Sequence, residues 1–583
     1  RPAMAESLTR LTASTLPAPP EPVRGLYTLD DTLLASGDAD ASWWDRTSSR
    51  WRPLRVPPVS AGEGAWRNAA PGRLYRLQRT RDGTDMAGLE RASRTGDTLA
   101  WRALPPFPRH LRHVQVAEGG DTLYVSGQDG AGHVLFLRRA VTTDTVPWEA
   151  LPPWPGTGVP ASLVAQRGEL MTTVSGAAAD VLWRWSRDGG WRMLPPVPGK
   201  FVADGPARAV GQAHVLYALQ SHDDPAAARL ATFHTITGAW AELDPPDGGL
   251  PASMTAWGDG VAGVDARTGA VRTVALVGNT YLLKWLDWLV IVVYLAAMVG
   301  IGLYFYLQEK RASTADFFVG GRSIPFWAAG VSLYATNTSS ISFIAIPAKA
   351  FETNWQYLTN NLIAVLGLMF VAVWIVPLLR RLDLMSVFSY LEKRFHPAIR
   401  MLASALCIAM QIGSRMSVIL FLPALAIATI TGLDVVWSIL IMGVFTILYT
   451  TLGGMKAVIW TDFVQVFVMF GGAIFAIGFI IYHLNGGMPE FVQVAMAEDK
   501  TRLFDFSFDL TKATVWGFIF LVLFDVVLTF PKDQVLMQRV LSTKSDKEAG
   551  RSVWAFAAIM IPGGFVFYGI GTALFVYYKN NPE

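Results

Sequence analysis

A short polar run interrupts one of the apolar segments in the second half of the chain. Six of the seven residues from Thr336 to Ser342 carry a hydroxyl or an amide, although apolar residues surround them at 325–331 and 343–348. Polar side chains are costly in lipid and therefore face a bundle interior or a cavity. The run predicts a helix broken halfway through a membrane, with oxygen atoms that suit a small cation and a small-molecule substrate.

The same run has a plainer interpretation as a contact between two helices, because small polar residues also pack helices together in lipid. Such a contact needs polar residues along one stripe only. Six polar positions in seven cover every face of a helix. We therefore favour a transport site over a packing contact.

One arginine in a second apolar segment bears on the substrate. Arg415 lies in "MQIGSRMSVILF" (410–421), where an unpaired guanidinium would be expensive. Its planar fork of donors pairs well with a carboxylate, which predicts an acidic substrate. The alternative is a partner within the protein, for which Asp525 in 521–530 is the candidate.

Long apolar runs must position these residues, and they begin near residue 285. A hydrocarbon core of about 30 Å needs roughly 20 apolar residues in a helix. We therefore expect an all-α membrane region over 281–583, in which eight helices span a membrane. The predicted spans are 286–307, 325–348, 358–379, 401–430, 435–452, 459–482, 513–530 and 552–578.

Lysine and arginine are divided unequally between the two sets of loops that join these spans. One set carries fourteen of them, and the opposite set carries four. Because basic residues concentrate in cytoplasmic loops, the richer set is predicted to be inside. The first span then runs from outside to inside, and the region before it is periplasmic or extracellular, on a cell (inner) membrane. The richer set consists of 308–324, 380–400, 453–458 and 531–551.

The first 280 residues are rich in Trp, Pro, Gly and Arg, and a Trp-x-x-Leu-Pro-like element recurs in them. Its copies begin at Trp51, Trp101, Trp148, Trp191 and Trp240, at intervals of 50, 47, 43 and 49 residues. This is the length of one four-stranded propeller blade. We expect each element to form an outer strand that leads into the next blade, with its Trp packed between sheets.

The two ends of this region are predicted to complete one blade together. "TLPAPP" (15–20) is a sixth element without its Trp, and 252–276 offers about three strands without a closing element. Pairing the first strand with the last three would close a ring and remove exposed sheet edges. We therefore predict a six-bladed all-β propeller over 8–280, within a domain of 1–280, rather than an irregular β sandwich.

Other features of the whole chain limit the possibilities. Cys407 is the only cysteine, so an internal disulfide is impossible. The net charge of +3 averages two unlike halves, and we expect no nucleic-acid partner. No cleavable leader follows Arg1, which predicts that a signal peptide has been removed or that the chain begins inside a longer gene product.

Three motifs resemble the sodium:solute symporter family. "ADFFVGGRSIPFWAAGVSLYATNTSSISF" (315–343) resembles its first core helix, "YTTLGGMKAVIWTDFVQVFVMFGG" (449–472) the start of its fifth, and "DQVLMQRVLSTKS" (533–545) the loop after its sixth. The resemblance covers about 286–583 and implies an inverted-repeat fold of five plus five core helices, preceded by an extra helix. It also implies sodium as the coupling ion. Because the chain stops after the seventh core helix, the second repeat is incomplete and we expect a fragment of a longer protein.

The resemblance implies roles for residues of the broken helix. The carbonyls of Ala335 and Thr338 match positions that hold the main sodium ion. The side chains of Asn337, Ser339 and Ser342 match positions that face the substrate.

It also implies roles for residues on other helices. Tyr357 and Asn361 match positions that close over a bound sugar, and Arg415 lies where sialic acid transporters hold the substrate carboxylate. Asp462 matches a carboxylate that binds a second sodium ion in some members. Its alternative role is a structural carboxylate bonded to nearby backbone.

The leading hypothesis is sodium-coupled symport of a small organic solute, namely a carboxylated sugar such as sialic acid. The first half resembles the kelch-repeat class and, within it, the N-acetylneuraminate mutarotase (epimerase) family, although its blades keep one glycine of the usual pair. This implies a propeller that binds or anomerises the substrate, but no catalytic residue can be mapped onto it. The alternatives are a sugar-binding or mutarotase propeller on a membrane anchor or receptor, and a symporter for a neutral sugar or an amino acid.

Overall fold

The computed structural model describes residues 9–581, apart from short internal gaps. These gaps are 38–39, 58–62, 143–145, 177–178, 203–204, 222–227, 245, 247–249, 252, 259, 266–267, 279–282, 309–313, 383 and 385. Within the described ranges, the description leaves out the side chains at positions 9, 10, 63, 64, 253, 278, 315, 340, 341, 414, 415, 449 and 452. The chain divides into two compact units: the first comprises Arg1–Asn279 and Tyr578–Glu583, and the second comprises Thr280–Tyr577.

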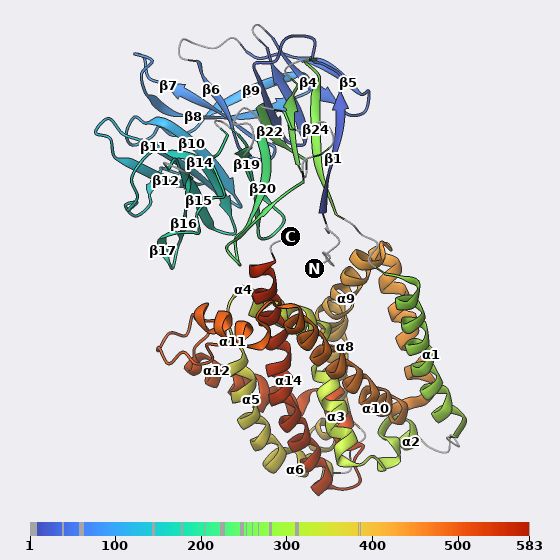
Figure 1. The fold of residues 1–583 in the computed structure, drawn as a ribbon. Coiled ribbons are helices and arrows are strands. Elements are labelled where there is room, and N and C mark those ends of the chain that lie inside the picture. The colour runs from blue at the N-terminus through green and yellow to red at the C-terminus, as the bar shows by residue number, and fades with distance from the viewer. Residues whose placement is uncertain are drawn as a thin grey trace. The chain divides into compact units, whose positions relative to one another are not determined.

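The first unit is a six-bladed β-propeller, as predicted, and each blade is an antiparallel sheet of four strands (Figure 1). Five blades use four consecutive strands each, which excludes the irregular sandwich. Their strands are β2 (Gly25–Leu29), β3 (Thr32–Ser36), β4 (Ala41–Asp45), β5 (Arg50–Leu54), β6 (Glu63–Ala70), β7 (Arg73–Arg79), β8 (Met86–Thr95), β9 (Thr98–Ala103), β10 (Arg112–Gly119), β11 (Thr122–Gln128), β12 (Val134–Ala140), β13 (Glu149–Ala150), β14 (Pro160–Gln166), β15 (Glu169–Val174), β16 (Val181–Ser186), β17 (Gly190–Met193), β18 (Ala207–Val210), β19 (His214–Gln220), β20 (Ala228–His234) and β21 (Ala239–Glu242).

The sixth blade joins the two ends of the propeller. Its strand order is β1-β24-β23-β22, so the first strand of the chain is the outer strand beside the last one. Leu11 lies opposite Leu276 in this antiparallel pair. The predicted closure of the ring is therefore confirmed. The bounds are β1 (Thr9–Leu16), β22 (Ser253–Trp257), β23 (Gly260–Val264) and β24 (Val271–Gly278).

The Trp elements form the outer strands of their blades or lead directly into them, as predicted. Three of the indole N–H groups donate to a proline carbonyl in the preceding copy of the element. These bonds run from Trp51 to Pro17 (2.8 Å), from Trp148 to Pro105 (2.9 Å) and from Trp191 to Pro152 (3.1 Å). One repeated motif therefore supplies both the donor and the acceptor that tie neighbouring blades together.

Trp101 does not make this bond. Its indole nitrogen is buried without a hydrogen-bond partner in the described part of the chain. The preceding element has Arg55 where the others have proline, and the Arg55 carbonyl accepts a bond from the Leu99 amide instead (2.9 Å). The Trp240 indole nitrogen also lacks a partner among the described residues, although Pro195 stands in the preceding element. The proline alone therefore does not decide whether the bond forms.

The second unit is made of helices (Figure 1). Among the described residues, six helical segments are long and apolar enough to cross a membrane. They are Trp285–Gln308, Leu358–Arg381, Pro397–Thr431, Gly453–His483, Val515–Lys532 and Asp546–Asn580. Their exposed surfaces are rich in large apolar side chains, as expected for helices surrounded by lipid.

Two of the eight expected spans have a different form in the structure. The segment at 325–348 divides into α3 (Phe326–Asn337) and α4 (Ser340–Glu352), and each half is too short to cross a bilayer alone. The segment at 435–452 begins α10 (Val435–His483), which bends sharply at Gly454 (φ 57°, ψ −157°). A Cβ at Gly454 would lie 2.9 Å from the Phe317 carbonyl oxygen, so this bend requires glycine.

The remaining helices are complete spans, parts of spans, or short helices between them. They are α1 (Trp285–Gln308), α2 (Thr314–Val319), α5 (Leu358–Phe370), α6 (Val376–Arg381), α7 (Ser389–Arg394), α8 (Pro397–Met410), α9 (Met416–Thr431), α11 (Gly487–Ala497), α12 (Val515–Val522), α13 (Gln534–Leu541) and α14 (Asp546–Asn580). Single π-helical turns at Val371–Ile375, Gln411–Arg415 and Leu523–Val527 interrupt three of the spans. Such turns are frequent at functional sites.

Candidate functional site

The polar run does break its helix. Thr338 ends α3 in an extended conformation (φ −84°, ψ 108°), and α4 begins at Ser340. In a regular helix the Ser342 amide would donate to the Thr338 carbonyl, but here it donates to Ser339 (2.9 Å). The expected departure from helical geometry is therefore confirmed, and it is centred on Thr338 and Ser339.

The side chains around this break differ in exposure. Asn337 is exposed, whereas Ser339 and Ser342 are half-buried. The Thr336 hydroxyl donates back to the Ser332 carbonyl (2.7 Å), so it stabilises the last turn of α3. Ala335 packs against the apolar core of the helical unit. The five predicted residues Ala335, Asn337, Thr338, Ser339 and Ser342 thus surround one interruption of the backbone.

Tyr357 and Asn361 lie at the start of α5, apart from the break in sequence. The Tyr357 ring centroid is 5.8 Å from that of Phe518 in α12. The Asn361 amide nitrogen would lie 3.4 Å from a Cβ placed on Gly564 of α14. The two predicted residues therefore face α12 and α14, while the other group lies between α3 and α4.

Arg415 and its alternative partner Asp525 lie in π-helical turns of two different spans. The backbone of Arg415 ends the turn Gln411–Arg415, but its side chain lies outside the described residues. Asp525 lies in the turn Leu523–Val527 and is exposed. Both possible partners of Arg415, the substrate and Asp525, therefore stay predictions.

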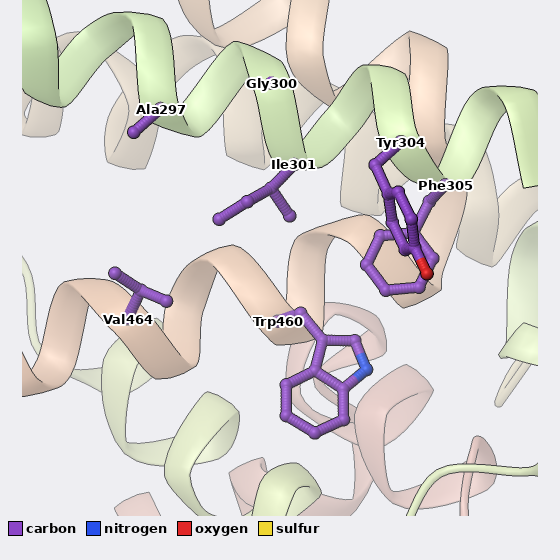
Figure 2. A pocket seen from close by; sticks show the side chains of 7 residues that line it. All are labelled: Ala297, Gly300, Ile301, Tyr304, Phe305, Trp460 and Val464. Atoms are coloured by element: carbon purple, nitrogen blue, oxygen red, sulfur yellow. The ribbon is translucent and has the colours of Figure 1, made fainter.

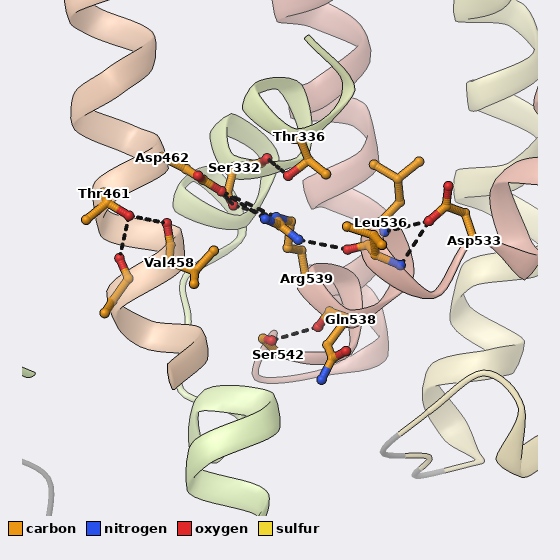
Figure 3. Close-up of polar contacts among 12 residues, drawn as sticks. Ser332, Thr336, Val458, Thr461, Asp462, Asp533, Leu536, Gln538, Arg539 and Ser542 are labelled. Atoms are coloured by element: carbon orange, nitrogen blue, oxygen red, sulfur yellow. Dashed lines mark hydrogen bonds and ion pairs between the residues drawn. The ribbon is translucent and has the colours of Figure 1, made fainter. Parts of the chain in front are cut away.

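Asp462 lies in a polar cluster with Ser332 and Arg539 (Figure 3). Asp462 Oδ2 accepts bonds from the Ser332 hydroxyl (2.5 Å) and from Arg539 Nη2 (3.1 Å), and Arg539 Nε also donates to the Ser332 oxygen (2.8 Å). The Arg539 and Asp462 side chains are 10% and 13% exposed. The cluster therefore joins α3, α10 and α13 through a largely buried ion pair.

The partners of Asp462 bear on its two predicted roles. Among the described residues they are a serine side chain and a guanidinium. The role as a ligand of a second sodium ion and the role as a structural carboxylate both stay predictions. Arg539 was not among the predicted site residues, because the sequence counts it only as one positive charge of a cytoplasmic loop. Its place among the buried residues Leu536 and Val540 of α13 is the signal that could have found it.

The chemistry around the break fits a cation with oxygen ligands. Among the described residues, no group of three or more His, Cys, Asp or Glu side chains could hold a metal ion. A cation here would therefore draw mainly on backbone carbonyls and hydroxyls, which suit sodium better than a transition metal.

An apolar pocket of about 430 Å³ lies between α1 and α10 (Figure 2). Its lining is apolar except for the Tyr304 hydroxyl and the Trp460 indole nitrogen, so it does not resemble a site for a sugar acid. The lining residues are Ala297, Gly300, Ile301, Tyr304, Phe305, Trp460 and Val464.

Comparison with known proteins found a family similarity in the second half of the chain. Residues 317–579 match the model of the sodium:solute symporter family. The resemblance predicted from three motifs is therefore confirmed for this part of the chain. The resemblance of the propeller to kelch proteins and mutarotases stays a prediction.

Two curated bacterial relatives match about half of this chain. The sodium/sialic acid symporter SiaT of Proteus mirabilis (strain HI4320) is 36% identical over 300 residues, which are 51% of this chain and 60% of the relative. The sodium/sialic acid symporter NanT of Aliivibrio fischeri (strain ATCC 700601 / ES114) is 33% identical over 299 residues, or 51% of this chain and 59% of the relative. The chain thus spans about three fifths of the length of these relatives.

A solved structure is similar over the same share of the chain. It is a Na⁺-coupled sialic acid symporter in a substrate-bound, outward-open state, with 34% sequence identity and a TM-score of 0.47. The match covers 51% of this chain and 62% of that one.

Proposed function

We propose that this chain is part of a sodium-coupled symporter for a small organic solute, with a carboxylated sugar such as sialic acid as its substrate. The main support is the helix break at Thr338 and Ser339, inside the region that matches the symporter family. Two relatives named as sodium/sialic acid symporters support the choice of substrate.

In this proposal the residues around the break have two roles, namely sodium binding and substrate contact. The carbonyls of Ala335 and Thr338 hold sodium, while Asn337, Ser339 and Ser342 contact the substrate. Sodium supplies the driving force, because one charge that crosses 100 mV of membrane potential releases about 2.3 kcal/mol.

The other predicted residues would complete the binding site. Tyr357 and Asn361 close over the bound sugar, and Arg415 pairs with its carboxylate. Asp462 contributes to a second sodium site. Rocking of the helices then exposes the bound solutes to the other side of the membrane.

The proposal also assigns places to the two domains. Residues 281–583 form the transmembrane domain in a cell (inner) membrane. Residues 1–280 form a periplasmic or extracellular propeller that binds or anomerises the substrate. The excess of basic residues in one set of loops supports this orientation.

Uptake into vesicles tests the symport proposal. The full-length protein is reconstituted, and uptake of labelled sialic acid is measured with and without an inward sodium gradient. We expect sodium-dependent uptake, which Asn337→Ala weakens by raising the KM for the substrate. Thr429→Val is a matched control, because Thr429 is exposed and bonds only to Leu425 of its own helix α9 in the described chain. Uptake that does not respond to sodium would remove the proposal.

Arg415→Ala separates acidic substrates from the alternative of a neutral sugar or an amino acid. If Arg415 pairs with a substrate carboxylate, the variant loses uptake of acids more than uptake of neutral sugars. Equal loss for both classes would favour a structural pair with Asp525.

The resemblance of the propeller to the mutarotase family suggests a second candidate function, namely a sugar-binding or mutarotase module that acts at the surface. Its test is exchange between the anomers of N-acetylneuraminate, followed by NMR with and without the purified protein. Faster exchange would show an enzyme, and binding without faster exchange would show a binding module.

A further inference from the structure

The segment that joins α11 to α12 exposes a row of aromatic side chains. In residues 503–510, here named the aromatic loop, Phe504, Phe506 and Phe508 are 48%, 68% and 80% exposed. Asp505 and Asp509, which lie between and after them, are only half-exposed. A loop in water has the opposite preference, with charged side chains outward and aromatic ones inward. This pattern indicates that the loop faces a surface that is not water.

The aromatic loop is held in this orientation by its own hydrogen bonds. The Asp505 carboxylate accepts the Ser507 amide (2.9 Å), and the Asp509 carboxylate accepts the Thr511 amide (2.9 Å). The Val515 amide donates to the Asp505 carbonyl (2.9 Å), so the loop folds back onto the start of α12. The acidic side chains therefore stabilise the loop while the phenylalanines point outward.

The aromatic loop continues the exposed apolar surface of α12. Trp516, Ile519, Phe520 and Leu523 lie along one side of the span Val515–Lys532 and are 45–62% exposed. The rings of Phe508 and Trp516 are 6.3 Å apart, and the Trp516 indole nitrogen donates to the Phe506 carbonyl (3.2 Å). One aromatic surface thus runs from the side of the span to the loop beyond its end.

This position determines what the loop can contact. The residues directly beyond the end of a membrane span lie at the level of the lipid headgroups, where aromatic side chains concentrate. Apolar side chains on such a segment enter the boundary between headgroups and acyl chains.

We propose that the aromatic loop inserts Phe504, Phe506 and Phe508 into the membrane–water interface of the leaflet in which α12 begins. The partner is the phospholipid bilayer itself. The proposal does not depend on the transported solute or on which side of the membrane this leaflet faces.

The anchor would act on the helices that carry the candidate site. The Thr359 hydroxyl of α5 donates to the Leu503 carbonyl, and Lys500 Nζ donates to the carbonyl of Phe351 at the end of α4 (2.8 Å). Insertion of the loop therefore holds the ends of α4 and α5 at a fixed depth relative to the bilayer.

Fluorescent labels at single cysteines test the proposal. Because Cys407 is the only cysteine, Cys407→Ala provides a background without thiols. In this background, Phe506→Cys, Phe508→Cys and Ala497→Cys are each labelled with the environment-sensitive fluorophore NBD. Ala497 is the matched control, since it is exposed at the end of α11 in the segment that precedes the loop. The full chain is reconstituted into phosphatidylcholine vesicles.

Two quenchers distinguish lipid from water and from protein. We expect labels at 506 and 508 to be quenched by nitroxide-labelled lipid and protected from aqueous iodide, and the label at 497 to behave oppositely. Equal iodide quenching at all three positions would overturn the proposal. Protection from both quenchers at 506 and 508 would show that a protein surface covers the loop, and would overturn it as well. Labelling at Phe504→Cys repeats the test should one of the other variants fail to fold.

Discussion

Polar contacts between neighbouring elements differ between the propeller and the helical unit. In the propeller, similar contacts recur from blade to blade. Besides the three Trp–Pro bonds, Asn68 Nδ2 donates to the Thr28 carbonyl (2.6 Å) and Gln166 Nε2 to the Gly211 carbonyl (3.2 Å), each in a neighbouring blade. In the helical unit, the cluster of Ser332, Asp462 and Arg539 joins three helices at one place.

This difference predicts which substitutions destabilise each unit most. A ring of repeated bonds shares its stability among many equivalent contacts, so the loss of one is a small change. The ion pair of Arg539 and Asp462 is largely buried, and the loss of one partner leaves a buried charge behind. The following predictions test this contrast, beginning with the largest effect.

Arg539→Ala should cost the helical unit about 3–5 kcal/mol of unfolding free energy, because it leaves the Asp462 carboxylate buried and unpaired. Adding Asp462→Asn should recover part of this loss. Thermal unfolding of the single and double variants measures the coupling. Arg381→Ala is the control, since the ion pair of Arg381 with Asp546 is exposed and should be worth less than about 1 kcal/mol. Equal losses of unfolding free energy in Arg539→Ala and Arg381→Ala would contradict the special role of the buried ion pair.

Acid should destabilise the propeller through His234. Burial, together with neighbouring His214, lowers the pKa of His234 to about 4, and its Nδ1 accepts the Thr237 amide only in the neutral form. The unfolded chain takes up this proton near pH 6.5. The contribution is therefore complete above pH 6.5 and is lost as the pH falls towards 4. We expect a loss of about 1–2 kcal/mol, reduced by the partial exposure of the ring.

Urea unfolding between pH 7.5 and 4 measures this effect. His234→Gln should remove part of the pH dependence. A pH dependence equal to that of the unaltered chain would assign the acid sensitivity to other groups.

Trp148→Phe should cost the propeller about 1 kcal/mol, the typical net contribution of one hydrogen bond, beyond the change in packing. Trp101→Phe should cost less, because the Trp101 indole nitrogen has no partner in the described chain. Unfolding of the two variants by denaturant compares them directly. If both lose the same stability, the Trp–Pro bonds contribute nothing measurable.

Tyr217→Phe should stabilise the propeller by about 0.5–1 kcal/mol, because it removes a buried hydroxyl for which the described residues offer no partner. The contacts of the ring with Phe201 and Trp240 remain. Tyr75→Phe is the matched control and should destabilise, since the Tyr75 hydroxyl donates to buried Glu118 (2.6 Å). A loss of melting temperature in both variants would contradict the prediction.

The propeller could be predicted from sequence because its information is local and repeated. The spacing of Trp51, Trp101, Trp148, Trp191 and Trp240 gives the blade length, and "TLPAPP" without its Trp indicates the closure. The bonds between blades were not predicted, since they depend on how adjacent sheets face each other. The element sequence alone does not give the missing bonds either, because Trp240 lacks one although Pro195 stands in the element before it.

The candidate site could be predicted only where its signal lies within one segment. The run from Thr336 to Ser342 is polar within an apolar segment, and this difference in polarity predicts the break. The pair of Arg539 and Asp462 spans 77 residues and depends on the packing of α13 against α3 and α10, which no local pattern contains. From the sequence, Arg539 was used only as one basic residue in the prediction of membrane orientation, and its burial was not predicted.

The closure of the ring determines when the strands of the sixth blade can pair during synthesis. β1 is synthesised before the other propeller strands, yet its partner is β24, which ends at Gly278. Only six residues separate β24 from the apolar helix that starts at Trp285. The edge of β1 that pairs with β24 therefore stays unpaired until nearly the whole propeller has been synthesised. A nascent chain halted before Val271 would hold five blades and an open seam, and the first long apolar helix would emerge almost as soon as that seam could shut.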